Sequence, residues 1–466
     1  MKAPEVQTTD IPGLLVVQLP VHEDARGWFK ENWQREKMTA AGLPDFRPVQ
    51  NNVSFNREPG TTRGIHAEPW DKYVAVVGGS VFGAWVDLRA GEGFGTSFTT
   101  ILTAGQAVFV PRGVGNGFQT LEPNTGYSYL VTEHWSPHAQ ENYTFVNLAD
   151  ETANIPWPIP LDKATISDAD KSHPALADVV PVQPLKTLVI GGSGQLGRAL
   201  SALLSGDGRH EFPRRSEFDL CNPAHVARVN WSDYGTVINA AAYTQVDLAE
   251  SEIGRHDAWA TNVTAMERLA QICIEHRITL VHVSSDYVFD GRKRAYGEED
   301  APCPLGVYGQ TKAAGDALVR MVPWHYVIRT SWVVGEGKNF VTTMSRLAQT
   351  GVNPSVVNDQ YGRLSFTTDI SAGIVHLLDS GAPYGVYNLT NDGEPTSWAD
   401  IAKRVFMLCG HDPDRVNEIS TADYFEGRPH TAPRPASSNL RLDKIQETGF
   451  RPMDQHERLA GYLENM

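Results

Sequence analysis

The sequence has few cysteines and no long apolar segment. Its four cysteines fall at irregular spacing without a CxxC pair, so we expect reduced thiols in a cytoplasmic protein. The most apolar window, residues 73–86, is interrupted by three glycines and is too short to span a bilayer. The first residues lack the continuous apolar run of a secretory signal, so neither secretion nor a membrane partner is expected.

Positive charge is also scarce, because 40 lysines and arginines stand against 55 aspartates and glutamates, for a formal charge of −15. Binding to nucleic acid needs a basic surface that neutralises phosphates, so no nucleic-acid partner is expected. An anionic substrate must instead be held by a local basic pocket.

The chain contains two halves with different patterns. Up to about residue 160, short runs of β-branched and aromatic residues alternate with Gly, Pro and Asn turns, which predicts an all-β sandwich, barrel or jelly roll. From residue 185 onward, apolar strands such as 185–190 alternate with helical stretches such as 256–276, which predicts a doubly wound parallel sheet. We therefore expect a β domain over 1–176, a linker over 177–184 and an α/β domain over 185–466.

The second half opens with a glycine-rich turn. Gly191, Gly194 and Gly197 follow the first apolar strand in a GxxGxxG spacing. This spacing lets backbone N–H groups approach a pyrophosphate at a helix N-terminus. Alone, it is also compatible with a turn that binds nothing.

A tyrosine and a lysine four residues apart strengthen the case for a reductase. Tyr308 and Lys312 share one helical face, where the ammonium can lower the phenol pKa and help the phenol to donate a proton as hydride arrives. Ser285, at the end of the strand that begins at Leu280, is placed to hydrogen-bond the substrate oxygen. Taken separately, such a pair is more often a surface feature and such a serine a cap.

Seven stretches of the second half occur together in one enzyme family: 191–197, 239–247, 284–291, 308–312, 329–332, 359–363 and 432–435. With these stretches, the half resembles dTDP-4-dehydrorhamnose reductase, an extended short-chain dehydrogenase. The resemblance implies a Rossmann doubly wound sheet with a small substrate-binding subdomain, and NADPH or NADH as cofactor. It also implies a catalytic triad of Ser285, Tyr308 and Lys312, in which the family more often has threonine at the first position.

The same resemblance assigns ligand contacts. Besides Tyr308 and Lys312, the residues expected to bind the dinucleotide are Gly191, Gly194, Gln195, Leu196, Gly197, Asp219, Leu220, Asn239, Ala240, Ala241 and Tyr243. Those expected to reach the sugar nucleotide are Trp332, Asn339 and Arg434. Arg214 and Arg215 could hold the 2′-phosphate of NADP through their forked donors, and two solvated arginines are an equal alternative.

Basic side chains are spread along the β-like segments of the first half. A pocket containing Arg26, Arg63, His66, Lys72 and Arg89 would suit a diphosphate and an enolate. No second histidine follows His66 at ligand spacing, so no metal is expected. A purely structural role for His66 remains an alternative.

The first half also carries a set of family motifs: 24–29, 50–54, 63–66, Lys72, 86–89, 111–113, 155–158 and 167–170. With them, residues 12–176 resemble dTDP-4-dehydrorhamnose 3,5-epimerase, a metal-free cupin. The resemblance implies that His66, oriented by Asp170, removes the protons α to a 4-keto group, and that Lys72 stabilises the enolate oxygen. It further implies a homodimer formed through this domain and substrate contacts from Arg26, Phe29, Gln50, Asn52, Arg63, Asn116 and Trp135.

Two positions depart from the epimerase pattern. Asn116 replaces a histidine of the family, and Trp135 stands where the family has the tyrosine that reprotonates the opposite face of the sugar. An indole cannot donate that proton at neutral pH. The proton could come from Tyr127, Tyr129, Tyr143 or water, or the epimerisation could be partial or altered.

Together the two halves predict a bifunctional enzyme. The first would convert dTDP-4-dehydro-6-deoxyglucose to its 3,5-epimer, and the second would reduce the C4 ketone to give dTDP-L-rhamnose. The alternative is a reductase whose β-rich half only binds the dTDP-4-dehydro-6-deoxyhexose.

Overall fold

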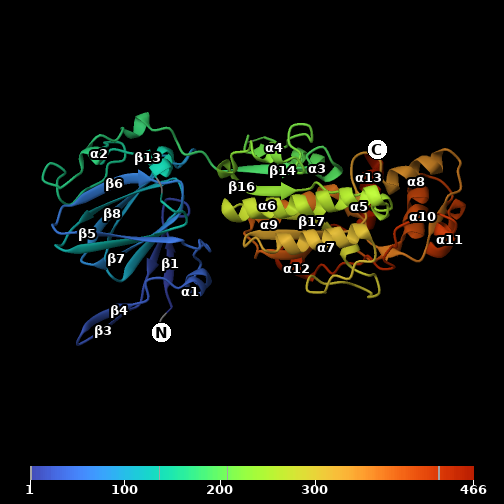
Figure 1. The fold of residues 1–466 in the computed structure, drawn as a ribbon, viewed down its shortest axis with the longest axis horizontal. Helices are drawn as coiled ribbons and strands as arrows, with labels where there is room; N and C mark the ends of the chain where they lie inside the picture. Colours follow the sequence, from blue (N-terminus) through green and yellow to red (C-terminus); the bar gives the residue numbers. More distant parts are fainter. Residues whose placement is uncertain (1–2, 136, 207, 429–430) are drawn as a thin grey trace. The chain divides into compact units, whose positions relative to one another are not determined.

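The computed structural model spans residues 1–466 and describes residues 3–135, 137–206, 208–428 and 431–466. They form two compact units, 1–184 and 185–466 (Figure 1). The stretch expected to be a linker, 177–184, falls in the first unit, where Val182 forms a parallel bridge with Arg89. Among the described residues, we find no helix with the length and apolar character needed to cross a membrane.

The first unit is rich in strands, as the sequence predicted. One sheet has the strand order β1-β2-β10-β7-β12-β5 and a second has the order β13-β6-β11-β8-β9. The strands of the first sheet are β1 (Glu5–Thr8), β2 (Leu15–Gln18), β5 (Gln50–Asn56), β7 (Lys72–Gly78), β10 (Gln106–Val110) and β12 (Thr125–Val131). Those of the second are β6 (Thr62–Ala67), β8 (Val81–Asp87), β9 (Ser97–Leu102), β11 (Val114–Thr120) and β13 (Thr144–Phe145).

The core of this unit lies between the two sheets. Val74 and Val108 of the first sheet pack with Trp85 and Phe118 of the second. Because side chains alternate along a strand, Tyr73 points the other way and packs with Met38 of helix α1 (Arg35–Ala40). Helix α2 (Asp168–Lys171) and the hairpin of β3 (Val21–Asp24) and β4 (Gly27–Lys30) complete the unit.

The second unit is a mixed α/β structure around a parallel sheet, again as predicted. The strand order is β15-β14-β16-β17-β18-β23, and every neighbouring pair is parallel. The strands are β14 (Lys186–Ile190), β15 (His210–Glu211), β16 (Tyr234–Asn239), β17 (Thr279–Ser285), β18 (His325–Thr330) and β23 (Gly385–Asn388). Since β15 and β16 flank β14 on opposite sides, the chain reverses direction across the sheet beside β14, where α/β proteins bind ligands.

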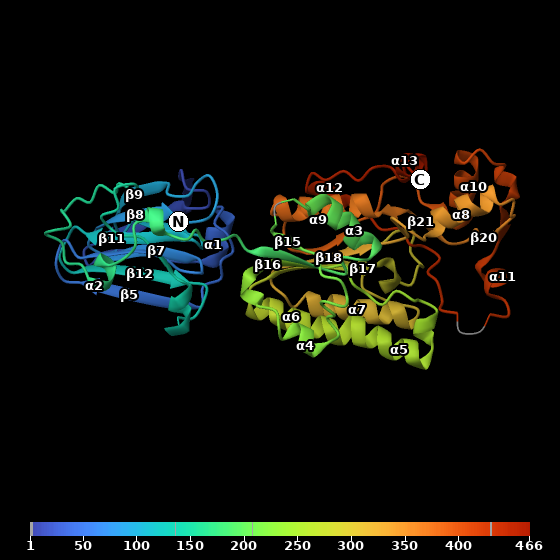
Figure 2. The same cartoon turned by 90° about the horizontal axis from the view of Figure 1, so that it is seen from above.

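Helices cover both faces of this sheet (Figure 2). One face packs on α4 (Pro223–Val226), α6 (Ala265–Glu275) and α7 (Val307–Val319), and the other on α3 (Gln195–Leu204), α9 (Thr367–Asp379) and α12 (Asp443–Glu447). Helix α5 (Glu252–Trp259) precedes α6. This layering leaves the carboxyl ends of the strands and the loops after them to form a site.

A separate core holds a smaller group of elements together. It joins α8 (Phe340–Gln349), α10 (Trp398–Leu408) and α13 (Gln455–Glu464). The remaining short elements are β19 (Val333–Val334), β20 (Ser355–Val357), β21 (Tyr361–Gly362), β22 (Ser365–Phe366), β24 (Thr396–Ser397), β25 (Asn417–Ile419) and α11 (Thr421–Phe425).

Candidate active sites

The glycine-rich turn joins β14 to α3 and requires glycine for steric reasons. Gly191 has a φ of +87°, and a Cβ there would lie 2.7 Å from the backbone nitrogen of Ala241. A Cβ on Gly197 would lie 2.2 Å from the carbonyl oxygen of Gly191. Helix α3 begins after Gly194 without a side-chain cap, so its first N–H groups remain available to an anion.

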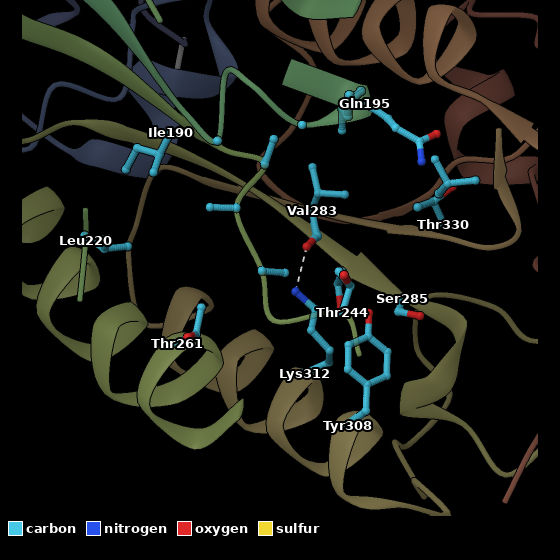
Figure 3. Close-up of a pocket in the computed structure, with 18 of the residues that line it drawn as sticks. Ile190, Gln195, Leu220, Thr244, Thr261, Val283, Ser285, Tyr308, Lys312 and Thr330 are labelled. Atoms are coloured by element: carbon cyan, nitrogen blue, oxygen red, sulfur yellow. Dashed lines mark hydrogen bonds between the residues drawn. The ribbon is translucent and has the colours of Figure 1, made fainter. Parts of the chain in front are cut away.

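A cavity of about 570 Å³ begins at this turn (Figure 3). The predicted residues that line it are Gly191, Gly194, Gln195, Leu196, Arg215, Asp219, Leu220, Ala240, Ala241, Ser285, Tyr308, Lys312 and Trp332. Gly197, Arg214, Asn239 and Tyr243 are not among its lining residues. The glycine-rich turn and the Tyr308 hydroxyl thus border one space, which fits a nicotinamide dinucleotide.

Tyr308 and Lys312 extend from α7 toward this cavity, as Figure 3 shows. The Lys312 Nζ donates to the carbonyl oxygen of Val283 at 2.7 Å, and the lysine side chain is buried. Burial lowers the pKa of Lys312 to about 8, while the charge of Asp316 opposes the shift. Burial also raises the pKa of Tyr308, and the hydrogen bond with Ser285 opposes this increase.

Sequence reasoning missed the carboxyl group beside Ser285. The Ser285 hydroxyl donates to Asp286 Oδ1 at 2.9 Å, and the other carboxyl oxygen of Asp286 is buried without a partner. Burial raises the pKa of Asp286 to about 6, against the effect of hydrogen bonds from Ser438 and Ser285. The hydroxyl expected to contact the substrate is therefore oriented by a carboxyl that titrates near neutral pH.

A π-helical turn between α5 and α6, Ala260–Thr264, supplies another unpredicted group. Such turns are frequent at functional sites. Thr261 lines the cavity, and Asn262 accepts from the Tyr243 backbone N–H at 2.9 Å and donates to Thr311 at 3.0 Å. Asn262 thus links the loop after β16 to the helix that carries Tyr308.

The two candidate arginines differ in position. Arg215 lines the cavity and pairs with Asp219 at 3.2 Å. Arg214 does not line it, and its backbone N–H donates to Glu217. Arg215 is therefore the better placed of the two for a phosphate on the adenosine ribose.

A second cavity, of about 860 Å³, contains two of the three residues expected to bind the sugar nucleotide. Asn339 and Arg434 line it together with Trp398. Arg434 is held by Asp247 at 2.8 Å. Trp332 lines the first cavity and stacks on Trp398 with ring centroids 3.8 Å apart, so the aromatic pair joins the two spaces.

In the first unit, His66 and Asp170 form a hydrogen-bonded pair. His66 Nε2 lies 2.8 Å from Asp170 Oδ1, and Ser167 caps α2, which carries Asp170. Burial would raise the pKa of Asp170, but the hydrogen bond and charge of His66 lower it overall. The ionised carboxylate can only accept, so His66 carries a proton on Nε2, and Nδ1 is its basic nitrogen.

Lys72 lies close to this pair. Its Nζ is 2.7 Å from Glu68 Oε2, in an ion pair that sequence reasoning missed, and 3.4 Å from the carbonyl oxygen of His66. The side chain is only 4% exposed. A buried ammonium held in this way is suited to meet a developing negative charge.

Gln50 and Asn52 both contribute polar groups from strand β5. Gln50 donates to Asn52 at 2.9 Å and accepts from the Trp135 backbone N–H at 3.1 Å. Tyr129 lies opposite Asn52 on β5 and opposite Val74 on β7. Since Lys72 is two residues from Val74, the side chains of Lys72 and Tyr129 share one face of the sheet.

The three tyrosines named as proton donors are not equivalent. The Tyr127 hydroxyl is fully buried and donates to Asn116 Oδ1 at 3.1 Å. Tyr129 and Tyr143 are only partly buried. Burial and the charge of Glu68 raise the pKa of both, so each hydroxyl keeps its proton at neutral pH.

A second histidine, His173, lies near His66 in the folded chain although it is distant in sequence. The ligand atoms of His66, Asp170 and His173 lie within 4.8 Å of one another. The spacing in sequence gave no indication of this neighbour, because His173 is far from His66 along the chain. Burial and the neighbouring His66 lower the pKa of His173, and Asp170 Oδ1 is already engaged by the His66 N–H.

Two of the five residues predicted for the basic pocket, Arg26 and Arg89, form local ion pairs. Arg26 pairs with Asp24, its side chain is 89% exposed, and Phe29 on the same hairpin is 66% exposed. In Figure 1 this hairpin of β3 and β4 projects on the side of the unit away from β6 and α2. Arg89 pairs with Asp87 at 2.7 Å.

Arg63 lies on the same strand as His66. It lies three residues before His66 on β6, is exposed, and donates to Asn56 at 3.2 Å. Asn116 pairs directly with His66 across β11 and β6. The indole of Trp135 is 56% exposed.

The cavity lined by the glycine-rich turn, Tyr308, Lys312 and Ser285 defines the second unit as a dinucleotide-dependent reductase of the short-chain class. The first unit is β-rich and contains the His66–Asp170 pair. The chain belongs to the family described as "RmlD substrate binding domain", whose model matches residues 185–466. Residues 8–178 match the model of dTDP-4-dehydrorhamnose 3,5-epimerase. Both resemblances expected from the sequence are confirmed.

Individual relatives match one half each. The chain is 52% identical over 180 residues to the RmlC homolog of Streptococcus pyogenes serotype M6, which covers 38% of this chain and 90% of that protein. It is 40% identical over 292 residues to dTDP-4-dehydrorhamnose reductase of Aggregatibacter actinomycetemcomitans, with 59% and 97% covered. The structure of dTDP-4-dehydrorhamnose reductase from Bacillus anthracis with NADP is 30% identical, covers 60% of this chain and 99% of that one, and gives a TM-score of 0.55.

Proposed function

We propose that the chain is a bifunctional enzyme of dTDP-L-rhamnose synthesis. The first unit epimerises dTDP-4-dehydro-6-deoxyglucose at C3 and C5, and the second reduces the C4 ketone with NADPH or NADH. The observation that carries the proposal is that one chain holds both constellations: the His66–Asp170 pair beside Lys72, and Tyr308 with Lys312 at a glycine-cradled cavity. The relatives of the two halves, a dTDP-4-dehydrorhamnose reductase among them, support the same assignment.

The epimerase chemistry follows from the C4 ketone, which makes the hydrogens on C3 and C5 acidic. His66 Nδ1 removes each proton in turn, and Asp170 stabilises the imidazolium that forms. The Lys72 ammonium offsets the charge on the enolate oxygen. Gln50, Asn52, Arg63, Asn116 and Trp135 are proposed to hold the sugar nucleotide around this centre.

We assign the opposite-face proton to Tyr129. Tyr127 is engaged with Asn116, whereas Tyr129 is only partly buried and shares the sheet face of Lys72. Burial and Glu68 keep its pKa high, so the phenol is protonated and able to donate. Tyr129 would thereby supply the proton that the family's tyrosine donates and that Trp135 cannot.

In the reductase unit, Tyr308 donates a proton to the C4 oxygen while Ser285 hydrogen-bonds that oxygen. When bound, the dinucleotide supplies the hydride. The turn from Gly191 to Gly197 receives the pyrophosphate, and Arg215 is placed for the 2′-phosphate of NADPH. Trp332, Asn339 and Arg434 are proposed to bind the sugar nucleotide.

At the level of fold, the two facing antiparallel sheets support a cupin jelly roll and the reversal beside β14 supports a Rossmann sheet. The domain limits of 1–176 and 185–466, with a linker over 177–184, remain part of the proposal. So does a cytoplasmic location.

A homodimer formed through the first unit also belongs to the proposal. The exposed side chains of Arg26 and Phe29 on the β3–β4 hairpin support it, because the hairpin projects away from β6 in its own chain and could complete the site of a partner. Sedimentation of the full chain measures this directly.

The experiment that separates the bifunctional enzyme from a reductase with a binding module is hydrogen exchange. The full chain is incubated with dTDP-4-dehydro-6-deoxyglucose in D₂O without nicotinamide. Deuterium at C3 and C5 supports an active epimerase, and its absence would leave the β-rich unit as a binding module.

A further inference from the structure

Behind Lys312 lies a buried histidine that the mechanism has not used. His282, on β17, is 1% exposed. Its Nε2 is 3.1 Å from Lys312 Nζ, and its Nδ1 is 3.1 Å from Asn239 Nδ2. The imidazole therefore stands between an amide of β16 and the amine of α7, and its hydrogen bonds determine which groups can carry protons.

Asn239 determines which atoms donate and which accept in these hydrogen bonds. Its Oδ1 accepts from the Ala241 backbone N–H at 3.2 Å, so its Nδ2 faces Met266 Sδ and His282. An amide nitrogen only donates. His282 Nδ1 must therefore be an acceptor without a proton.

The remaining proton of the ring is then on Nε2. Burial holds the pKa of His282 well below its usual value, so the ring is neutral and carries one N–H. With Nδ1 accepting, this N–H is on Nε2 and points at Lys312 Nζ. An ammonium has three donors and no acceptor, so it would oppose this N–H, whereas an uncharged amine accepts it through its lone pair.

We propose that His282 is a positioning residue of the reductase site, which as its Nε2–H tautomer donates to Lys312 and favours the uncharged form of that amine in the cofactor-free protein. The catalytic meaning of this inference rests on the proposed reductase function. The amine then donates one N–H to the Val283 carbonyl oxygen and keeps the other for the cavity that Lys312 lines.

The charged groups around His282 are compatible with this state. Asp316, on α7, has Oδ1 4.0 Å from His282 Nε2, beyond hydrogen-bond distance. Its other oxygen accepts from Arg329 Nε of β18 at 3.2 Å. The guanidinium thus balances the carboxylate, and Lys312 is not needed as its counter-ion.

The first test is the tautomer of His282 in the full-length, cofactor-free protein. Histidine labelled with ¹⁵N is followed by NMR between pH 6 and 8, and the His282 signal is assigned as the one lost in His282→Gln. The inference predicts a protonated Nε2 and an unprotonated Nδ1 throughout. A proton on Nδ1, or on both nitrogens, would overturn it.

The second test replaces the hydrogen-bond donor at position 239 with an acceptor. In Asn239→Asp, a carboxylate can accept from both Ala241 and His282 Nδ1, which moves the ring proton to Nδ1 and lets Nε2 accept from a Lys312 ammonium. The expected result is the Nδ1–H tautomer and a Lys312 titration, read from ¹⁵N-lysine signals, at least tenfold less acidic. Met266→Leu, which removes the other partner of Asn239, should leave both signals unchanged.

These readouts require no turnover. If Asn239→Asp switches neither the tautomer nor the lysine titration, the inference is wrong, and if that variant does not fold, the wild-type tautomer still decides. An Nε2–H tautomer in a chain that never oxidises NADPH would contradict the reductase function and leave the inference intact.

Discussion

Asp170 accepts a hydrogen bond from His66 at 2.8 Å across 104 residues of sequence. The pair sets the tautomer of the histidine and thereby makes Nδ1 the base. An aspartate that only held α2 in place would not need to be ionised, whereas the hydrogen bond and charge of His66 lower the pKa of Asp170. The contact therefore links the short helix near the end of the first unit to proton transfer.

Asp170→Asn should reduce deuterium exchange at C3 and C5 by about 100-fold, because the neutral amide stabilises the imidazolium less. Exchange is measured by NMR in D₂O without nicotinamide. The matched control is Asp168→Asn, on the same helix but with a fully exposed side chain, which should exchange at the wild-type rate. Equal losses in both variants would show that the helix, not the carboxylate, matters.

Tyr129→Phe should separate exchange from inversion. Without the opposite-face acid, His66 can still remove a proton and return a deuteron to the same face, so exchange continues while formation of the L-configured product falls by about 100-fold. Tyr127→Phe, whose hydroxyl is occupied by Asn116, should invert normally and lose about 1 kcal/mol of stability. Normal inversion in Tyr129→Phe would move the assignment to Tyr143 or water.

Arg215→Ala should raise the KM for NADPH by about tenfold and change the KM for NADH little, since a forked guanidinium binds a 2′-phosphate that NADH lacks. Arg214→Ala is the control, because Arg214 does not line the cavity. Initial rates with each cofactor measure the effect. Equal changes for both cofactors in Arg215→Ala would contradict a phosphate contact.

The stability of the chain should depend on the ionisation of Asp286. Its folded pKa of about 6 lies above the ordinary aspartate value of 3.8, so the folded state binds the proton more tightly and stability is lost as pH rises through this window. Relative to wild type, Asp286→Asn should gain on the order of 2 kcal/mol between pH 4 and 7.

Thermal unfolding at several pH values tests this gain, with the exposed Asp379→Asn as the control. A constant difference between Asp286→Asn and wild type across the pH range would show that the carboxyl does not titrate as described.

The sequence predicted those features whose signal is local. The glycine turn and the Tyr308–Lys312 pair depend on spacings within one loop or helix, and both line one cavity in the structure. His173 could not be predicted without the fold, because only the return of the chain brings it to His66. Glu68 lies four residues before Lys72, so their ion pair could have been predicted from the spacing.

Arg26 and Arg89 have local partners that their spacing could have indicated. Each follows an aspartate by two residues and pairs with it, so the Asp-x-Arg spacing favoured an ion pair for each arginine. Their role in substrate binding stays a prediction.

The central claim is that one chain both epimerises and reduces the same ketosugar. The most direct measurement supplies the full chain with dTDP-4-dehydro-6-deoxyglucose and NADPH in D₂O and identifies the sugar by NMR. The account predicts dTDP-L-rhamnose with deuterium at C3 and C5 and one NADPH oxidised per sugar. Consumption of NADPH to give a D-configured, undeuterated sugar, or no consumption at all, would contradict it.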